Sequence, residues 1–446
     1  MEGTAKVTVG IDGWNDAEVQ PATKTLKVLA PKQKAATLPV SERVVRMLNF
    51  ADKKARLAKL SFTPDGKRLL ATGMQWYQSW DAATWKELVR VEPLVGITRG
   101  EMHTTVSADG STVAQVGLHV ERENNEIEGK LVNRLRVTGQ FHLHDSTSAK
   151  PKWSKQYNDR GPGNVTLSPD GKHAVVVFEL NGVGNEPPTY TTEFWDLGKN
   201  TSKVLFDQRS GAVFSPDGRK VYVSATEQTS ATDIKSTLYV IDTATLKTVK
   251  EIPAAASTVF GIRAISPDDK ILLAMEANIK TRKFAAVFLD AGTFKELDRI
   301  PATVEFGTLA RMEHTEFSVD SSRVAFRLGK DTIQLWDSVQ KKVVRTIKDD
   351  SPGVLIGTLE LNRQGTMLAS IYPQDVSLQQ AYSRTGPSDP GQASVLLHDL
   401  TDIKRAPERI ALPAGATSVM VFSPDGKTLT VGLHGKVCIV DATMKK

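Results

Sequence analysis

Two histidines in similar sequence contexts are the side chains with the clearest capacity for chemistry. His103 lies in Glu-Met-His-Thr-Thr-Val, and His314 lies in Met-Glu-His-Thr-Glu-Phe. Histidine together with carboxylates can hold a divalent cation. The charged residues expected at the same level are Glu101, Arg263, Glu313, Glu316 and Glu360. A hydrogen-bonded, water-filled channel is the favoured interpretation of this set, and a metal or substrate site is the alternative.

A second set has the composition of a recognition surface. Large aromatic and Arg side chains in a concave, partly apolar site are typical anchors for a bound peptide. The candidates are Trp76, Arg122, Arg134, Tyr372, Tyr382, Arg384 and His434. For Trp76 a structural role is favoured, with its ring packed against Trp80 or Trp85.

Both sets are positioned by a turn that recurs eight times along the chain. An apolar strand end leads into Ser-Pro-Asp-Gly, in which Pro fixes φ, Asp bonds the local backbone and Gly supplies a positive φ. The positions aligned with its Asp are Asp65, Asp109, Asp170, Asp217, Asp268, Asp320, Gln364 and Asp425. Their spacing of 44 to 61 residues is that of a propeller blade. His103 and His314 each precede this position by six residues, which predicts that they face each other across a ring of eight.

Each repeat closes with an Asp that follows an apolar strand. The eight closing pairs are Trp80-Asp81, His144-Asp145, Trp195-Asp196, Ile241-Asp242, Leu289-Asp290, Trp336-Asp337, His398-Asp399 and Val440-Asp441. An Asp at this place can accept backbone N–H bonds and fix the following turn. We therefore expect structural roles, and no catalytic one, for all eight.

The alternation of Phe-Ser-Pro-Asp-Gly-Lys with Leu-Trp-Asp resembles WD40 repeats, and residues 214–252 resemble the related YVTN-type repeat. The resemblance covers residues 41–446. The Gly-His of the eukaryotic repeat is missing, so the chain is similar to the more degenerate bacterial WD-repeat proteins. The resemblance implies a β-propeller, and the known partners of eukaryotic members do not transfer.

The expected fold is an all-β, eight-bladed β-propeller, with seven blades as the alternative if the repeat of Gln364 is not a blade. Only five residues follow the last closing Asp, too few for an outer strand. The segment 41–50 has the matching pattern and is predicted to complete the eighth blade. Residues 1–40 predict a β-hairpin, with strands at 6–11 and 25–29, and a linker. The hairpin is either the end of an upstream sandwich domain or a strand pair on the propeller flank.

Loop lengths indicate which face of the propeller binds a partner. From the turn position to the closing Asp there are 36 residues in blade 2 (Asp109 to Asp145) and 35 in blade 7 (Gln364 to Asp399). This interval contains the b–c loop, so the length variation falls on one face, where function concentrates. The two long loops flank the short blades 8 and 1 and are predicted to form the walls of a groove. The favoured function is a non-catalytic scaffold for protein–protein interaction, and the alternatives are a hydrolase or lactonase with a divalent cation at the channel mouth, or a spacer between other domains.

Composition narrows the expected partners to proteins or peptides. Of the net charge of +6, residues 1–60 carry +5 and the other 386 residues carry +1, so a basic face for nucleic acid is not expected. No apolar run reaches membrane-spanning length, and no signal peptide is evident, which favours a cytoplasmic location. Cys438 lies in an apolar strand and is expected to be a buried, inert thiol. No cofactor motif occurs. We expect a monomer, and the alternative that the N-terminal hairpin raises is a part of a longer multidomain chain.

Overall fold

The structure is a computed structural model in which the chain divides into two units, Met1–Pro39 and Val40–Lys446. It describes residues 3–7, 24–28, 39–50, 57–73, 76–91, 102–127, 130–180, 182–183, 189–228, 234–302, 315–327, 332–348, 358–373, 393–402, 404–413, 416–433 and 435–444. Strands and turns account for the regular structure of these residues. Among them no helix has the length and apolar character needed to cross a membrane.

The first unit contains one antiparallel strand pair. Strand β1 (Gly3–Val7) pairs with β2 (Lys24–Val28), from Gly3 opposite Val28 to Val7 opposite Lys24. The first strand thus begins three residues before the predicted range 6–11, of which residues 8–11 lie outside the described residues.

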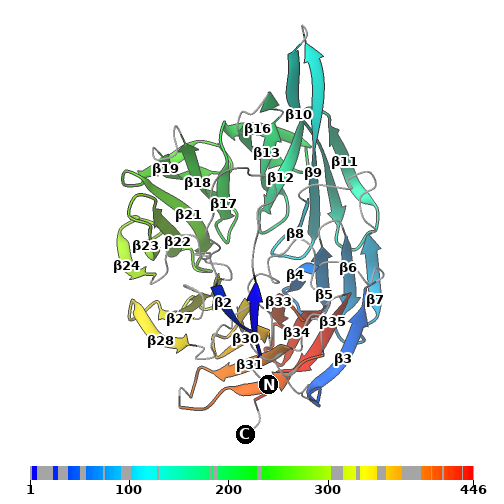
Figure 1. Ribbon diagram of the computed structural model, residues 1–446, viewed down its shortest axis with the longest axis vertical. Helices are drawn as coiled ribbons and strands as arrows, with labels where there is room; N and C mark the ends of the chain where they lie inside the picture. Colours follow the sequence, from blue (N-terminus) through cyan, green and yellow to red (C-terminus); the bar gives the residue numbers. More distant parts are fainter. Residues whose placement is uncertain are drawn as a thin grey trace. The chain divides into compact units, whose positions relative to one another are not determined.

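The second unit is a ring of eight four-stranded antiparallel sheets (Figure 1). Blade 1 consists of β4 (Leu57–Phe62), β5 (Arg68–Gly73), β6 (Tyr77–Asp81) and β7 (Glu87–Val91). Blade 2 consists of β8 (Met102–Val106), β9 (Thr112–Ile127), β10 (Lys130–Asp145) and β11 (Pro151–Tyr157), with the short β14 (Gly182–Val183) added to β10. Blade 3 consists of β12 (Arg160–Leu167), β13 (His173–Leu180), β15 (Tyr190–Asp196) and β16 (Thr201–Phe206). Blade 4 consists of β17 (Ser210–Phe214), β18 (Lys220–Gln228), β19 (Ile234–Asp242) and β20 (Thr248–Pro253).

The ring continues with the same strand order. Blade 5 consists of β21 (Thr258–Ile265), β22 (Ile271–Asn278), β23 (Lys283–Asp290) and β24 (Glu296–Pro301). Blade 6 consists of β25 (Thr315–Phe317), β26 (Arg323–Arg327), β27 (Thr332–Asp337) and β28 (Lys342–Lys348). Blade 7 consists of β29 (Thr358–Leu361), β30 (Met367–Pro373), β31 (Ala393–Asp399) and β32 (Glu408–Ala411). Blade 8 consists of β33 (Ala416–Phe422), β34 (Thr428–Leu433), β35 (Lys436–Asp441) and, as its outer strand, β3 (Val44–Asn49).

The eighth blade confirms the predicted closure of the ring. Strand β3 runs antiparallel to β35, with Val44 opposite Val440 and Asn49 opposite Lys436. The backbone N–H of Phe50 donates to the carbonyl of Gly435 at 2.9 Å and extends this pairing. The repeat that contains Gln364 is a complete blade, so the count is eight and the seven-blade alternative is wrong.

The recurring turns satisfy their own polar groups. In blade 1 the Asp65 carboxylate accepts hydrogen bonds from the Thr63 hydroxyl at 2.6 Å and from the Lys67 N–H at 3.0 Å. Gly66 has a φ of +69°, and its N–H donates to the Thr63 carbonyl at 2.8 Å. The closing Asp81 accepts from the N–H and the hydroxyl of Thr84, each at 2.7 Å. These are the structural roles expected for the two repeated Asp positions.

Large apolar side chains fill the spaces between neighbouring blades. Phe288 of blade 5 and Trp336 of blade 6 stack at a centroid distance of 4.0 Å, and both are fully buried. The indole N–H of Trp336 donates to Asp298 of blade 5 at 2.7 Å. In blades 2 and 7 the closing pairs carry His144 and His398 in place of Trp, and both imidazoles are buried. The buried apolar side chains of the described residues therefore form clusters that each join two neighbouring blades.

Candidate functional site

The face that carries the b–c and d–a connections is shaped by a long arm from blade 2. Strands β9 and β10 have 16 residues each and pair with each other as far as Ile127 opposite Lys130. Pairing with the neighbouring strands of the blade stops at Gly117 and Gly139, so the outer part of this hairpin extends beyond the blade (Figure 1). The blade 2 insertion, which the sequence analysis treated as a loop, is therefore a continuous β-hairpin.

The arm is attached to the next blade. Strand β14, which lies in the b–c connection of blade 3, pairs with β10 so that Val183 is opposite Arg134 and Gly182 is opposite Leu135. A two-residue bridge of this kind adds backbone hydrogen bonds across two blades. Strand β14 and the arm consequently belong to one sheet.

Of the seven residues predicted for the recognition surface, Trp76 has a described side chain. Its ring packs against Phe50, just after the closing strand, at a centroid distance of 4.6 Å, and Phe50 also contacts Trp80 at 6.1 Å. The ring pair of Trp76 is thus with Phe50, and Trp76 and Trp85 both pack against the core cluster that contains Phe50 and Trp80. Arg122 and Arg134 lie on the arm and Tyr372 lies in β30, with their side chains outside the described part. Tyr382, Arg384 and His434 lie outside the described residues altogether.

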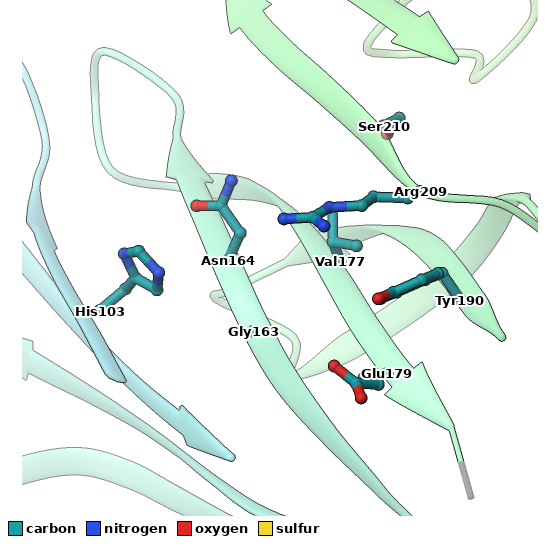
Figure 2. A pocket seen from close by; sticks show the side chains of 8 residues that line it. All are labelled: His103, Gly163, Asn164, Val177, Glu179, Tyr190, Arg209 and Ser210. Atoms are coloured by element: carbon teal, nitrogen blue, oxygen red, sulfur yellow. The ribbon is translucent and has the colours of Figure 1, made fainter. Parts of the chain in front are cut away.

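A polar cleft opens on the same face, between blades 2, 3 and 4 (Figure 2). Its volume is about 160 Å³. We call it the blade 3 cleft, and its lining residues are His103, Gly163, Asn164, Val177, Glu179, Tyr190, Arg209 and Ser210. The lining combines a guanidinium, an imidazole, an amide, a phenol and a carboxyl group, which suits hydrogen-bonded recognition of a small polar group.

The strands of blade 3 position three of these side chains. The pairing of β12 with β13 shifts between Pro162 and Asn164, so that Gly163 is an extra residue in the strand. Such a bulge redirects the side chain that follows it, and Asn164 is exposed in the cleft. Glu179 and Tyr190 are direct cross-strand partners at the end of β13 and the start of β15, which brings the carboxyl and phenol groups to one side.

Arg209 is held in place from two directions. Its guanidinium lies over the Tyr190 ring, 5.5 Å from the centroid. The buried Thr192 hydroxyl donates to the Gln208 carbonyl at 2.8 Å and lies 2.9 Å from the Ser210 hydroxyl. These contacts fix the backbone on either side of Arg209, so the cation is positioned before any ligand arrives.

A larger cavity, of about 780 Å³, occupies the central channel at the face formed by the recurring turns. The inner strands β4, β25, β29 and β33 form its wall, and turn residues such as Pro64, Pro267 and Pro424 surround it. Aromatic side chains from three of these strands, Phe62, Phe317 and Phe422, make much of the wall apolar.

Two carboxyl groups in this channel cavity lie against each other. Glu316 of β25 and Glu360 of β29 share a side-chain hydrogen bond. Burial raises the pKa of Glu316, and burial together with the neighbouring Glu316 charge raises the pKa of Glu360 well above its usual range. Lys59 of β4 lines the same cavity and favours the charged form of both. Burial and the closeness of the two carboxyl groups therefore both favour protonation of this pair.

The seven channel-mouth candidates thus separate. Glu316 and Glu360 meet in the channel cavity, whereas His103 lines the blade 3 cleft on the other face. Arg263 is exposed on β21, with a guanidinium nitrogen 3.9 Å from the Met275 sulfur. Glu101, Glu313 and His314 lie outside the described residues, so the opposition of His103 and His314 stays a prediction. Within the described ranges, no group of three His, Cys, Asp or Glu side chains is arranged to hold a metal ion.

Lys59, Asn164 and Arg209 were not predicted as site residues from the sequence. Lys59 and Asn164 each precede the turn position of their blade by six residues, as His103 does. This shared spacing could therefore have predicted the positions of Lys59 and Asn164 along their strands. Arg209 belongs to a d–a connection, whose course no repeat position predicts.

Comparisons with known proteins were made at the level of sequence and of structure. No protein-family model matches the chain, and no curated protein matches its sequence. Among solved structures, the C-terminal WD40 domain of Sif2 aligns with a TM-score of 0.56 and 12% identity, over 90% of this chain and 98% of that domain. The fold is that of a WD40 β-propeller.

Two further solved structures align with lower scores. The β-propeller domain of Cps50 (Swd1) from Myceliophteria thermophila aligns with a TM-score of 0.46 and 11% identity, over 91% of this chain and all of that one. Hydrazine synthase from Kuenenia stuttgartiensis aligns with a TM-score of 0.46 and 17% identity, over 79% of this chain and all of that one.

Proposed function

We propose that the protein is a non-catalytic scaffold that binds a protein or peptide partner on the face with the b–c and d–a connections. The observation that carries this proposal is the arm formed by β9 and β10. About nine residue pairs extend beyond the blade, which at ~3.3 Å per residue is an arm of roughly 30 Å. Such an arm adds surface to one face of the ring and is not needed to complete blade 2.

The difference between the two faces of the propeller supports the proposed binding face. The opposite face consists of short turns whose Asp and Ser side chains are bonded to their own backbone, as Asp217 is to Ser215 and Arg219. The arm, the β14 bridge and the blade 3 cleft all belong to the proposed binding face. We also propose that a groove between the blade 2 arm and the blade 7 connection, with Arg122, Arg134 and Arg384, contributes to partner binding.

We also propose that the protein is similar to bacterial WD-repeat and YVTN-type proteins. A cytoplasmic location is a further part of the proposal. The partner is a protein, because the charge excess of the chain lies in residues 1–60 and leaves the rest of the chain nearly neutral. A monomeric propeller presents one copy of the binding face.

Shortening the arm tests the proposal. Glu121 and Arg136 are opposite each other in the hairpin, so residues 122–135 can be replaced by Asn-Gly to give a two-residue turn at that point. Affinity capture from a lysate of the source organism, compared between the intact and shortened chains by quantitative mass spectrometry, should show a partner retained by the intact chain alone. Binding of that partner, once purified, should then be abolished or weakened at least about tenfold by the shortening.

A matched control keeps the result interpretable. Lys427→Glu changes an exposed charge in a turn of the opposite face and should leave capture unchanged. Both variants should keep the thermal unfolding transition of the parent chain. A shortened chain that folds and captures the same proteins as the intact one would overturn the proposal.

A further inference from the structure

The blade 3 cleft contains a fixed cation without an acceptor. Among the described residues, the Arg209 guanidinium contacts the Tyr190 ring and makes no hydrogen bond to the protein. A guanidinium has five N–H donors in a planar fork that matches a carboxylate. Figure 2 shows Arg209 extending across the cleft toward Asn164.

Asn164 adds a second set of unused polar atoms. The bulge at Gly163 presents its amide in the cleft, and within the described part of the chain that amide makes no hydrogen bond. His103, from the inner strand of blade 2, lies on the other side of Asn164 in Figure 2. Arg209 and Asn164 thus supply hydrogen-bond donors to one small space, which the His103 side chain also lines.

Glu179 makes one side of the cleft acidic. Its carboxyl group lies beside Tyr190, on the side opposite His103 (Figure 2). A ligand that fits must carry a negative group near Arg209 and must not place a second negative charge near Glu179. A singly charged carboxylate meets both conditions. A doubly charged phosphate is disfavoured by the same carboxyl group.

We propose that the blade 3 cleft binds the carboxylate of an Asp or Glu side chain in an extended segment of the partner protein. Its volume of about 160 Å³ accommodates one side chain of that size. The proposal rests on the proposed function, since it names the chemistry by which the scaffold recognises its partner. Because Arg209 is exposed at the rim, the interaction weakens as ionic strength rises.

Ligand-observed NMR with small capped dipeptides tests the cleft without knowledge of the partner. The probes are N-acetyl-Asp-Gly-amide and N-acetyl-Glu-Gly-amide, with the Asn, Gln and phosphoserine dipeptides as comparisons. We expect saturation transfer to the acidic dipeptides, with a dissociation constant of roughly 1–10 mM for ligands of this size. The neutral dipeptides should bind at least about tenfold more weakly, because they cannot make charge-assisted bonds to Arg209.

Two substitutions connect binding to the cleft. Arg209→Gln should reduce affinity for the acidic dipeptides at least about tenfold, and Asn164→Ala should reduce it a few-fold. Arg219→Gln removes a similarly exposed guanidinium from a turn on the opposite face and should have no effect. Equal binding of neutral and acidic dipeptides, unchanged binding by Arg209→Gln, or tightest binding of the phosphoserine dipeptide would each overturn the proposal.

The arm-shortened chain separates this inference from the proposed function. If shortening abolishes partner capture while Arg209→Gln retains both capture and dipeptide binding, the scaffold proposal stands and the cleft proposal fails. If the acidic dipeptides bind through Arg209 but no partner depends on the arm, the cleft is a carboxylate site and the scaffold proposal fails.

Discussion

Arg43 and Glu408 form an ion pair although 365 residues separate them in the chain. A guanidinium nitrogen of Arg43 lies 2.8 Å from one Glu408 oxygen and donates to the other at 3.0 Å. Arg43 also donates to the Asp441 carbonyl at 3.2 Å. Arg43 directly precedes the closing strand β3. Its side chain therefore connects this strand to β35 of blade 8 and to β32, the outer strand of blade 7.

Breaking this pair should lower the stability of the whole propeller. The Arg43 side chain is 7% exposed and that of Glu408 is 26% exposed, so removal of either partner leaves a poorly solvated charge. We expect Arg43→Met to reduce the free energy of unfolding by about 2 kcal/mol, less than for a fully buried pair. Chemical denaturation of Arg43→Met, Glu408→Gln and the double variant gives the coupling energy. A coupling energy near zero would show that the pair does not contribute to closure.

The two buried histidines predict a loss of stability in acid. Burial lowers the pKa of His144 to about 4, assisted by the neighbouring His142, and burial lowers that of His398 to about 4, assisted by Arg345. The unfolded chain then binds more protons than the folded one below pH 6.5. The stability contributed by each neutral imidazole is present above pH 6.5 and falls as the pH approaches 4, by about 2 kcal/mol at pH 5.

The double variant His144→Phe/His398→Phe isolates the contribution of these two imidazoles to the pH dependence of stability. Equivalent positions in blades 1, 3 and 6 carry Trp80, Trp195 and Trp336, so a planar apolar ring suits the site. Urea titrations at pH 8 and pH 5 should show a smaller difference between the two pH values for the double variant than for the parent. An unchanged difference would assign the acid sensitivity to other groups.

The channel carboxyl pair predicts the opposite pH dependence. The raised pKa values of Glu316 and Glu360 mean that their contribution is most favourable at low pH and is lost as the pH rises through the folded-state values. Glu360→Gln keeps a hydrogen-bond donor toward Glu316 and removes the second ionisable group. We expect this variant to be more stable than the parent at pH 8 and to lose that advantage at pH 4. Greater stability of the parent at pH 8 would show that Lys59 compensates the charge of both carboxylates.

Cys438 should be unreactive in the folded protein. The residue is fully buried in β35, and burial raises the pKa of its thiol to about 12. Reaction with a disulfide reagent at pH 8 should be at least about 100-fold slower than in guanidinium chloride, because the thiolate forms only on unfolding. Rapid labelling of the native chain would contradict the placement of this strand.

The sequence was sufficient for the propeller because each blade repeats the same local rule. A Pro, Asp and Gly at the turn and an Asp at the closing position specify strand ends without reference to distant contacts, and the missing outer strand of blade 8 followed from counting. Gln364 occupies a degenerate turn and still ends a true blade, because Asn362 supplies the backbone contacts that Ser and Asp make elsewhere.

The sites could not be predicted in the same way, because they depend on connections between repeats. Arg209 is positioned by Thr192 and Tyr190 of the adjoining strand, a relation that appears only when the d–a connection is folded. The proximity of Glu316 and Glu360 follows from neighbouring blades in register and was anticipated only as charge near the channel mouth. The role of Phe50 beside Trp76 required knowledge of where the closing strand ends.

The joining of β3 to β35 has a consequence for synthesis of the chain. Strand β3 is translated before the eight blades, and its pairing partner β35 follows about 390 residues later. At ~5–20 residues per second, roughly 20–80 s pass before that pairing can form. During this interval blades 1 to 7 can form in order while the edge of blade 1 next to β33 stays open. Completion of the propeller is therefore a single late event, and nascent chains that stall before residue 436 keep an unpaired strand available to other molecules.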